Sequence, residues 1–216
     1  MLCEEFSIIC QKGYSMTKIK ICGLKSEDDI SYVNELKPDY IGFVFLQGRK
    51  RYVSPSRAAH LRGLLDPSIP AVGVFVNEPL EQVIALAKSG TIQMIQLHGQ
   101  EDEAYLKELR KHCSQPVIKA FIIKTKEDME KALSFSSDYL LLDNGLGTGE
   151  AFDWSLIQNI DRPFFLAGGL NPGNAASAIK LAHPYALDVS SGVETDGKKD
   201  YEKIKAFIHA VRTTST

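Results

Sequence analysis

The sequence predicts an α/β protein with the architecture of a single-domain (β/α)8 TIM barrel. Short apolar runs rich in β-branched residues alternate with stretches of helical periodicity, which is typical of parallel strands joined by crossover helices. The runs at 41–45 and 71–76 lack polar alternation, as expected for strands that are buried on both faces. Eight such units would form a closed barrel near the lower end of its usual size. A doubly wound parallel sheet is the alternative fold.

The barrel strands are expected in eight segments, at residues 18–23, 40–45, 71–76, 94–98, 117–122, 139–143, 163–167 and 185–190. Between the first two, Ser26 and Asp29 form a capping-box-like helix start, and apolar residues follow on one face (Ile30, Val33 and Leu36). The same periodicity predicts a helix after Pro79 and another over residues 204–211.

Composition limits the classes of function. The chain has 216 residues and a formal net charge of −2, so it lacks the basic excess expected of a nucleic-acid-binding protein. No apolar run reaches the roughly 20 residues that span a bilayer, and Glu4 and Glu5 stand where a signal peptide carries positive charge. We therefore expect a cytoplasmic protein with no membrane partner. Residues 1–16 are interpreted as a non-catalytic extension, with Met16 as an alternative start, and residues 17–216 as the barrel domain.

The cysteines and histidines do not form a metal-binding or disulfide pattern. The four cysteines are spread along the chain without a C-x-x-C pair, and the five histidines are isolated (cysteines: Cys3, Cys10, Cys22 and Cys113). We expect free thiols, no metal and no cofactor. Cys22 differs from the others because it ends the first predicted strand, immediately before a glycine.

Functional side chains of such barrels gather where the strands end. Cys22 ends the first strand and Asp143 ends the sixth, so a thiol and a carboxyl group are expected to converge on one pocket. Two groups that can exchange protons on opposite sides of a bound molecule favour acid/base chemistry.

The last two strands end in loops that favour phosphate binding. Gly168 and Gly169 follow the seventh strand, Ser190 ends the eighth, and Ser191 and Gly192 come directly after it. Glycine pairs allow close backbone approach and expose N–H groups, and this end of the barrel commonly binds phosphate. A phosphorylated small-molecule substrate is therefore expected.

The motifs taken together resemble the phosphoribosylanthranilate isomerase family. The resemblance runs from about residue 18 to the C-terminus and is carried by the order of seven segments: KICG (20–23), GFVF (42–45), KRYVSP (50–55), VGVFVN (72–77), QLHG (96–99), FDW (152–154) and DVSSGVE (188–194). One segment departs from the family pattern, the glycine-rich stretch 144–150 after Asp143, which we interpret as either a lid or a turn without substrate contact.

The resemblance implies the third step of tryptophan biosynthesis, the Amadori rearrangement of N-(5-phosphoribosyl)anthranilate to 1-(2-carboxyphenylamino)-1-deoxyribulose 5-phosphate. It implies that Asp143 is the general acid and Cys22 the general base. A free thiol has a pKa of about 8.5, and we expect nearby N–H groups and the cation of Lys20 or Arg51 to favour the Cys22 thiolate.

The resemblance also suggests binding roles for three residues. Arg51 matches the family position that holds the anthranilate carboxylate, although it could be a solvated charge. His98 could line the anthranilate pocket or be a core histidine, and Asp188 could contact a ribose hydroxyl or cap its strand. The family is usually monomeric, and no long exposed apolar stripe compels pairing.

Two other functions compete with this interpretation. Indole-glycerol-phosphate synthase would require a catalytic Lys and a Glu at strand ends, but Lys119 lies within a strand and no Glu ends the second or sixth strand. A sugar-phosphate-binding protein without turnover would not need both Cys22 and Asp143. The sequence leaves open whether a histidine-pathway substrate is also accepted.

Overall fold

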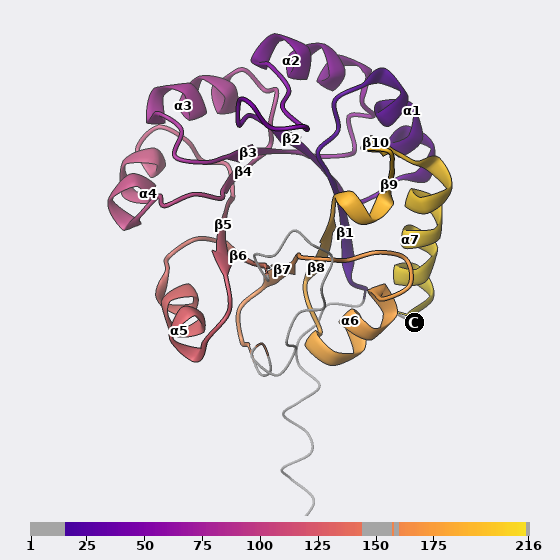
Figure 1. The fold of residues 1–216 in the computed structure, drawn as a ribbon. Coiled ribbons are helices and arrows are strands. Elements are labelled where there is room, and N and C mark those ends of the chain that lie inside the picture. The colour runs from indigo at the N-terminus through magenta and orange to yellow at the C-terminus, as the bar shows by residue number, and fades with distance from the viewer. Residues whose placement is uncertain (1–15, 144–156, 158–159, 215–216) are drawn as a thin grey trace, which may run out of the picture.

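The computed structural model describes residues 16–143, 157 and 160–214. Its eight parallel strands close into a barrel in chain order, as the view down the barrel axis shows (Figure 1). Their bounds are β1 Lys18–Cys22, β2 Tyr40–Val44, β3 Ala71–Phe75, β4 Met94–Leu97, β5 Val117–Ile122, β6 Tyr139–Asp143, β7 Phe164–Leu166 and β8 Ala186–Val189. Because β1 pairs with both β2 and β8, the sheet has no open edge, which confirms the predicted barrel and excludes the doubly wound sheet.

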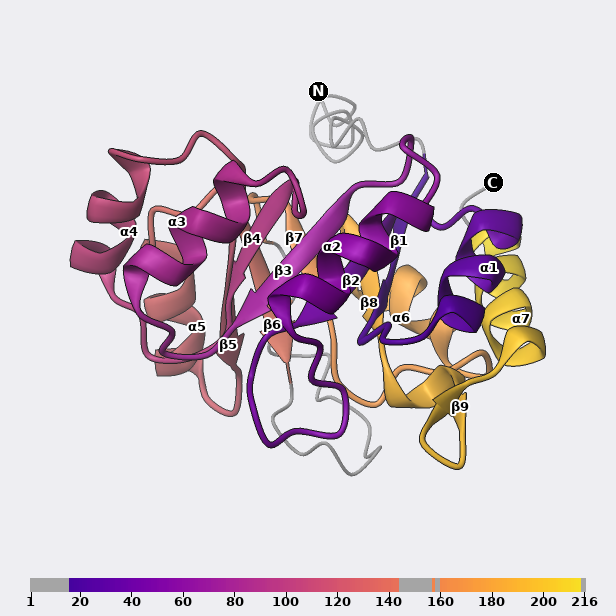
Figure 2. The same ribbon diagram turned by 90° about the horizontal axis from the view of Figure 1, so that it is seen from above.

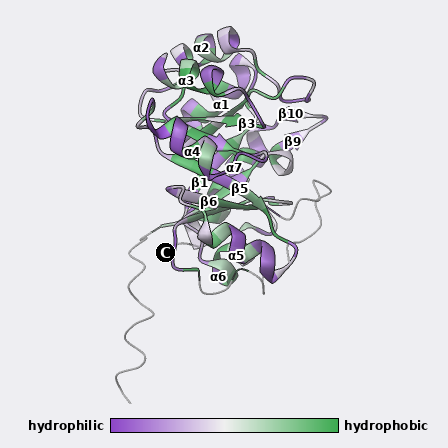
Figure 3. Ribbon diagram, turned by 90° about the vertical axis from the view of Figure 1, so that its left-hand side faces the viewer, coloured by the Kyte–Doolittle hydropathy of each residue, from purple (hydrophilic) through white to green (hydrophobic). Residues whose placement is uncertain are grey.

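Seven α-helices lie within the described residues and surround the strands. They are α1 Glu27–Leu36, α2 Pro55–Leu64, α3 Leu80–Lys88, α4 Glu103–Arg110, α5 Lys126–Ser134, α6 Ala175–Ala182 and α7 Tyr201–Thr214. The predicted capping box at Ser26 is present, since its side chain accepts from the backbone N–H of Asp29 and the Asp29 side chain accepts from the Ser26 N–H. Figure 3 shows the hydrophobic strands inside and the more hydrophilic helices outside.

Part of the connection between β6 and β7 lies outside the described residues. The glycine-rich stretch 144–150 and the segment 152–154 fall there, and so does the predicted N-terminal extension except for Met16. The expectations for these segments therefore stay predictions.

The core has two layers because side chains of a strand point alternately to the two faces of the sheet. In β6, Leu140 and Leu142 pack outward against the helices, whereas Leu141 points into the barrel interior with Ile118 and Phe165. These five side chains are fully buried. Truncating one of them, as in Leu141→Ala, is expected to lower the free energy of unfolding by about 2–5 kcal/mol. The barrel interior is thus a packed core.

Aromatic rings close the amino-terminal end of the barrel. Phe165 packs against three tyrosines, with ring centroids 5.6–5.7 Å apart (Tyr40, Tyr139 and Tyr185). These tyrosines stand at the start of β2, at the start of β6 and just before β8. Because these rings fill the amino-terminal end of the barrel, a pocket is expected at the opposite end, where the strands have their carboxyl ends.

A small hairpin that the sequence analysis did not predict lies at the rim. A 3-10 turn, η2 (Ser191–Val193), leads into β9 (Glu194–Thr195), which pairs antiparallel with β10 (Lys198–Lys199). Figure 2 shows the hairpin and the β2–α2 loop at the same end of the barrel. No described helix is both long and apolar enough to cross a membrane.

Candidate active site

A cavity of about 510 Å³ opens at the carboxyl ends of the strands. Nearly all of the predicted site residues line it: Cys22, Arg51, His98, Asp143, Gly168, Gly169, Asp188, Ser190 and Ser191. These residues come from the ends of β1, β4, β6 and β8 and from the loops after β2, β7 and β8. The volume is in the range of small-molecule sites.

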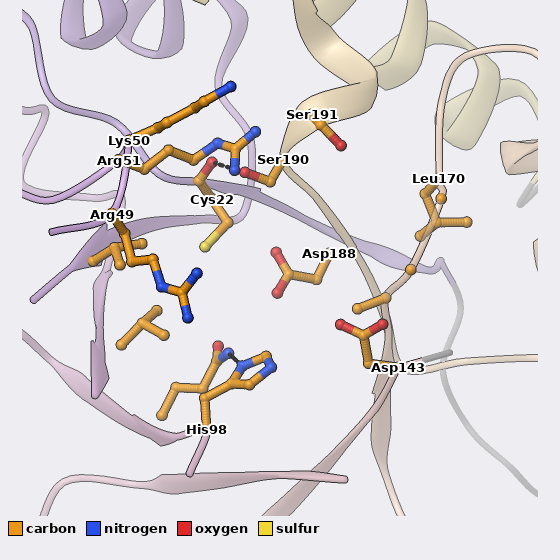
Figure 4. Close-up of a pocket in the computed structure, with 16 residues that line it drawn as sticks. Cys22, Arg49, Lys50, Arg51, His98, Asp143, Leu170, Asp188, Ser190 and Ser191 are labelled. Carbon is orange, nitrogen blue, oxygen red and sulfur yellow. Dashed lines mark hydrogen bonds between the residues drawn. The ribbon is translucent and has the colours of Figure 1, made fainter. Parts of the chain in front are cut away.

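Cys22 and Asp143 face the cavity from different sides. Figure 4 shows the Cys22 sulfur and the Asp143 carboxylate apart from each other, with the carboxylate of Asp188 between them. Cys22 is only 8% exposed. A molecule in the cavity can therefore contact the thiol and the Asp143 carboxyl group at different atoms.

The environment of Cys22 differs from the sequence-based expectation. Burial raises the pKa of the thiol above its ordinary value, and the opposing effect of the Lys20 and Lys199 cations does not reverse it. The expectation that nearby cations make the thiolate the favoured form was therefore wrong. The physical reason is that burial destabilises the thiolate by more free energy than its attraction to the buried ammonium groups restores.

Lys20 and Asp188 form a buried ion pair beneath the thiol. The β1–β8 register places them side by side, and Lys20 Nζ donates to Asp188 Oδ2 at 2.7 Å. Burial disfavours both charges. It raises the pKa of Asp188 against the opposing effect of Lys20, whereas for Lys20 the attraction of Asp188 and Cys22 outweighs burial and raises the pKa. The other oxygen, Asp188 Oδ1, is buried without a partner among the described residues. Because an unpaired buried acceptor is costly, this oxygen is suited to a hydroxyl donor of a bound molecule.

His98 is a neutral imidazole at the end of β4. Burial lowers its pKa despite the opposing charges of Asp143 and Asp188. Its Nδ1 lies 2.9 Å from Gln96 Nε2, and Gln96 Oε1 is the second buried oxygen without a partner among the described residues. With Gln96 donating to Nδ1, the remaining proton of His98 is on Nε2.

The two predicted phosphate loops lie side by side. Asn174 at the start of α6 fixes the loop after β7 by donating to the carbonyl of Gly169 at 2.9 Å. Ser190 donates from its hydroxyl to the carbonyl of Cys22 at 3.0 Å and so ties the loop after β8 to β1. Gly192 does not line the cavity. It packs against the carbonyl of Leu170, where a Cβ would lie 1.8 Å from the oxygen, so it allows the two loops to approach.

Arg51 lines the cavity but also has a partner that the sequence analysis did not foresee. Its Nε and Nη2 donate to the two carboxylate oxygens of Glu194, each at 2.7 Å. Lys199 Nζ donates to the same carboxylate at 2.8 Å. Burial opposes ionisation of Glu194, yet the hydrogen bonds from Arg51 and Lys199 outweigh it and lower the pKa of Glu194 to about 2. Arg49 points its guanidinium into the cavity (Figure 4).

Sequence reasoning assigned no role to Gln96, Glu194 or Lys199. Gln96 and Glu194 stand inside two of the recognised motifs, but a motif does not reveal which polar atoms are left unpaired after folding. Lys119, the residue that the competing synthase function would use, is ion-paired with buried Glu101 at 3.0 Å and is not among the residues that line the cavity.

Comparisons with known proteins agree with this arrangement. The family model of N-(5'phosphoribosyl)anthranilate (PRA) isomerase matches residues 19–210. The isomerase of Endomicrobium trichonymphae is 45% identical over 203 residues, which cover 92% of this chain and 100% of that protein. The isomerase of Thermoanaerobacter pseudethanolicus is also 45% identical, over 91% of this chain and 98% of its own length.

Solved structures of relatives have the same fold. The phosphoribosyl anthranilate isomerase of Thermotoga maritima superposes with a TM-score of 0.85 at 40% identity, covering 92% of this chain and 100% of that one. A phosphoribosyl anthranilate isomerase in complex with reduced 1-(o-carboxyphenylamino)-1-deoxyribulose 5-phosphate has a TM-score of 0.83 at 40% identity and the same coverage. The chain therefore belongs to the N-(5'-phosphoribosyl)anthranilate isomerase family.

Proposed function

We propose that this protein converts N-(5'-phosphoribosyl)anthranilate to 1-(o-carboxyphenylamino)-1-deoxyribulose 5-phosphate in tryptophan biosynthesis, with Asp143 as general acid and Cys22 as general base. The observation that carries the proposal is the placement of both groups on different sides of one cavity that two glycine- and serine-containing loops also line. Membership of the isomerase family supports the activity.

The substrate is oriented by its two anionic ends. The backbone of Gly168 and Gly169 and the Ser190 and Ser191 side of the cavity bind the phosphate, which suits N–H and hydroxyl donors. Arg51 binds the anthranilate carboxylate through the guanidinium edge that Glu194 leaves open. The sugar then lies between these ends, near Cys22 and Asp143.

Ring opening is the first chemical step. Asp143 donates a proton to the furanose ring oxygen, the bond from that oxygen to C1 breaks, and the nitrogen lone pair forms a C1=N iminium. The proton must come from a positioned acid because the leaving alkoxide is strongly basic. Asp188 Oδ1, the acceptor without a partner, receives a sugar hydroxyl.

Proton abstraction follows. The Cys22 thiolate removes the proton from C2, and the electrons of that C–H bond form the C1=C2 bond of an enolamine while the iminium is neutralised. The enolamine then takes a proton at C1 and loses its hydroxyl proton, which leaves a ketone at C2. The raised pKa of Cys22 makes its thiolate a stronger base, although less of it is present at neutral pH.

The fluorescence of the anthranilate group provides the test. Purified protein is expected to consume the fluorescent substrate and to form a product that indole-glycerol-phosphate synthase accepts. Asp143→Asn and Cys22→Ser are expected to bind the substrate but to lose turnover by at least about 100-fold, the range of single acid/base groups. A Cys22→Ser variant that retains most of the activity would refute the assignment of the base.

We also infer that the protein acts as a monomer, because the sequence has no long exposed apolar stripe that compels pairing. One solved relative, from Thermotoga maritima, is described as a monomer generated from a dimeric isomerase. Light scattering at the concentrations of the assay tests this inference: activity that appears only in a dimeric fraction would contradict it.

A further inference from the structure

The guanidinium of Arg51 is held along only one of its edges. Glu194 takes Nε and Nη2 in a side-on fork, with both distances at 2.7 Å, and no described residue accepts a hydrogen bond from Nη1. The side chain of Glu194 is 9% exposed, against 30% for Arg51. A planar guanidinium that is gripped on one edge presents a fixed second edge, which matches the geometry of a carboxylate.

Lys199 holds the gripping carboxylate in turn. Its side chain is 1% exposed, and its Nζ donates to Glu194 Oε1 at 2.8 Å and to the carbonyl of Ser190 at 2.9 Å. One buried ammonium therefore connects the partner of Arg51 with the loop after β8. Ser190 extends the connection to β1 through its hydrogen bond to the carbonyl of Cys22.

The charge of this cluster suits an anion. Two cations, Arg51 and Lys199, surround the single carboxylate of Glu194, which leaves one net positive charge at the cavity wall. A bound carboxylate would neutralise it. Buried ion pairs contribute little net stability compared with apolar side chains of the same volume, so stability alone does not account for burying Lys199 here.

Resting on the proposed function, in which Arg51 binds the anthranilate carboxylate, we propose that Glu194 and Lys199 are positioning residues: Glu194 fixes the orientation of the Arg51 guanidinium, and Lys199 links it to the phosphate-binding loop at Ser190. Neither residue touches the reacting atoms. The hairpin β9–β10 therefore sets the distance between the sites for the two anionic ends of the substrate.

The test compares two substrates that differ only in the carboxylate, N-(5-phosphoribosyl)anthranilate and N-(5-phosphoribosyl)aniline. Glu194→Gln keeps the shape of the side chain but loses the charge and the double acceptor. For the anthranilate we expect KM to rise about tenfold or more with kcat within about threefold, which is the loss of a charge-assisted hydrogen bond in ground-state binding. For the aniline the change in KM is expected to stay within about twofold.

A double-mutant cycle separates positioning from a general structural effect. If Glu194 acts through Arg51, Glu194→Gln adds less than about twofold to KM in an Arg51→Ala background. Lys199→Met is expected to raise KM for both substrates and to weaken inhibition by inorganic phosphate about threefold or more, because it releases Ser190 as well. The matched control is Glu27→Gln, which removes an exposed Arg–Glu pair at 3.1 Å and should leave both substrates unaffected.

The outcomes distinguish the two proposals. Wild-type protein that does not turn over the anthranilate would refute the proposed function. Wild-type turnover with an unchanged KM in Arg51→Ala would refute the role of Arg51 and, with it, this inference. A Glu194→Gln variant that loses activity equally on both substrates, or whose effect persists in the Arg51→Ala background, would overturn the positioning role alone. If Glu194→Gln does not fold, Glu194→Asp is measured on the same two substrates with the same criteria.

Discussion

At the scale of single residues, the site is governed by the competition between burial and charge around Cys22. Two ammonium groups, Lys20 and Lys199, lower the pKa of the thiol, yet its burial raises the pKa by more. A free thiol ionises with a pKa of about 8.5, so at neutral pH the buried Cys22 is mostly protonated. The thiolate of Cys22, the proposed base, is therefore a minor species at neutral pH but a stronger base than an ordinary thiolate.

The first prediction concerns the pH dependence of turnover. Turnover requires the protonated Asp143 carboxyl group together with the Cys22 thiolate, so kcat/KM for the anthranilate substrate follows the product of these two fractions. Because burial raises the pKa of the thiol, the fall of kcat/KM at alkaline pH should begin only above about pH 8.5, where an ordinary thiol has titrated. Steady-state kinetics on protein that stays folded, between about pH 6 and pH 10, where thiols titrate, provide the measurement. A fall of kcat/KM that begins below neutral pH would show that Cys22 is not the titrating base.

The second prediction concerns the buried pair beneath the thiol. Lys20→Met leaves the Asp188 carboxylate buried without its cation, and the variant should lose about 3–5 kcal/mol of unfolding free energy. Adding Asp188→Asn should recover a large part of that loss because the uncompensated charge is gone. Urea unfolding of the two variants measures this; equal stability of both would contradict the account. Lys18→Met, at the exposed pair with Asp39, is the control.

At the scale of elements, the end of β1 and the loop after β2 are built to fit each other. Gly23 has φ +84°, and a Cβ there would lie 2.4 Å from Arg51 Cδ. The absence of a side chain at Gly23 thus lets the stem of Arg51 cross the end of β1 on its way to Glu194.

The third prediction follows from this crossing. Gly23→Ala displaces Arg51, so KM for the anthranilate substrate should rise about tenfold, the effect of losing one charge-assisted contact. Gly90→Ala is the matched control because Gly90 has φ +76° but nothing within 4 Å of its added Cβ. Both variants place an alanine at a positive φ, which destabilises the backbone to a similar extent. Only Gly23→Ala should change KM. A similar KM in the two variants would argue against the crossing.

The regular elements could be predicted from the sequence, whereas the rim could not. The eight strands start within a residue of their expected positions because short apolar runs that alternate with helical periodicity indicate buried parallel strands. The hairpin β9–β10 has strands of only two residues each and no apolar pattern, so its sequence has no periodicity from which it could be predicted. Glu194 is the last residue of the DVSSGVE motif, but its contact with Arg51 spans 143 positions and depends on the folded barrel.

At the scale of the whole molecule, the two ends of the barrel have different tasks. The tyrosines around Phe165 close the amino-terminal end with apolar contacts. The carboxyl end instead gathers buried charges, among them Lys20, Asp188 and Lys199. Because such charges add little to stability, the fold depends on its apolar layers and the site on its polar rim.

The fourth prediction is the acid sensitivity of folding. Glu194 has a pKa of about 2 in the folded protein, below the roughly 4.3 of a free glutamate, so its contribution to stability is complete above about pH 4.3 and is lost as the pH falls toward 2. The unfolding free energy should fall less steeply with pH in Glu194→Gln than in the wild type over this window. Urea titrations at several pH values measure the slopes, and parallel slopes would contradict the account.

The central claim is the division of labour between Asp143 and Cys22, and a kinetic isotope effect tests it most directly. The substrate is deuterated at C2 of the ribose, and kcat is compared with that of the ordinary substrate. If Cys22 removes the C2 proton, residual turnover by Cys22→Ser should show a larger isotope effect than the wild type, because that step has become slower. If Asp143 opens the ring, Asp143→Asn should show an isotope effect near unity. The reverse pattern, or no change in either variant, would contradict the assignment.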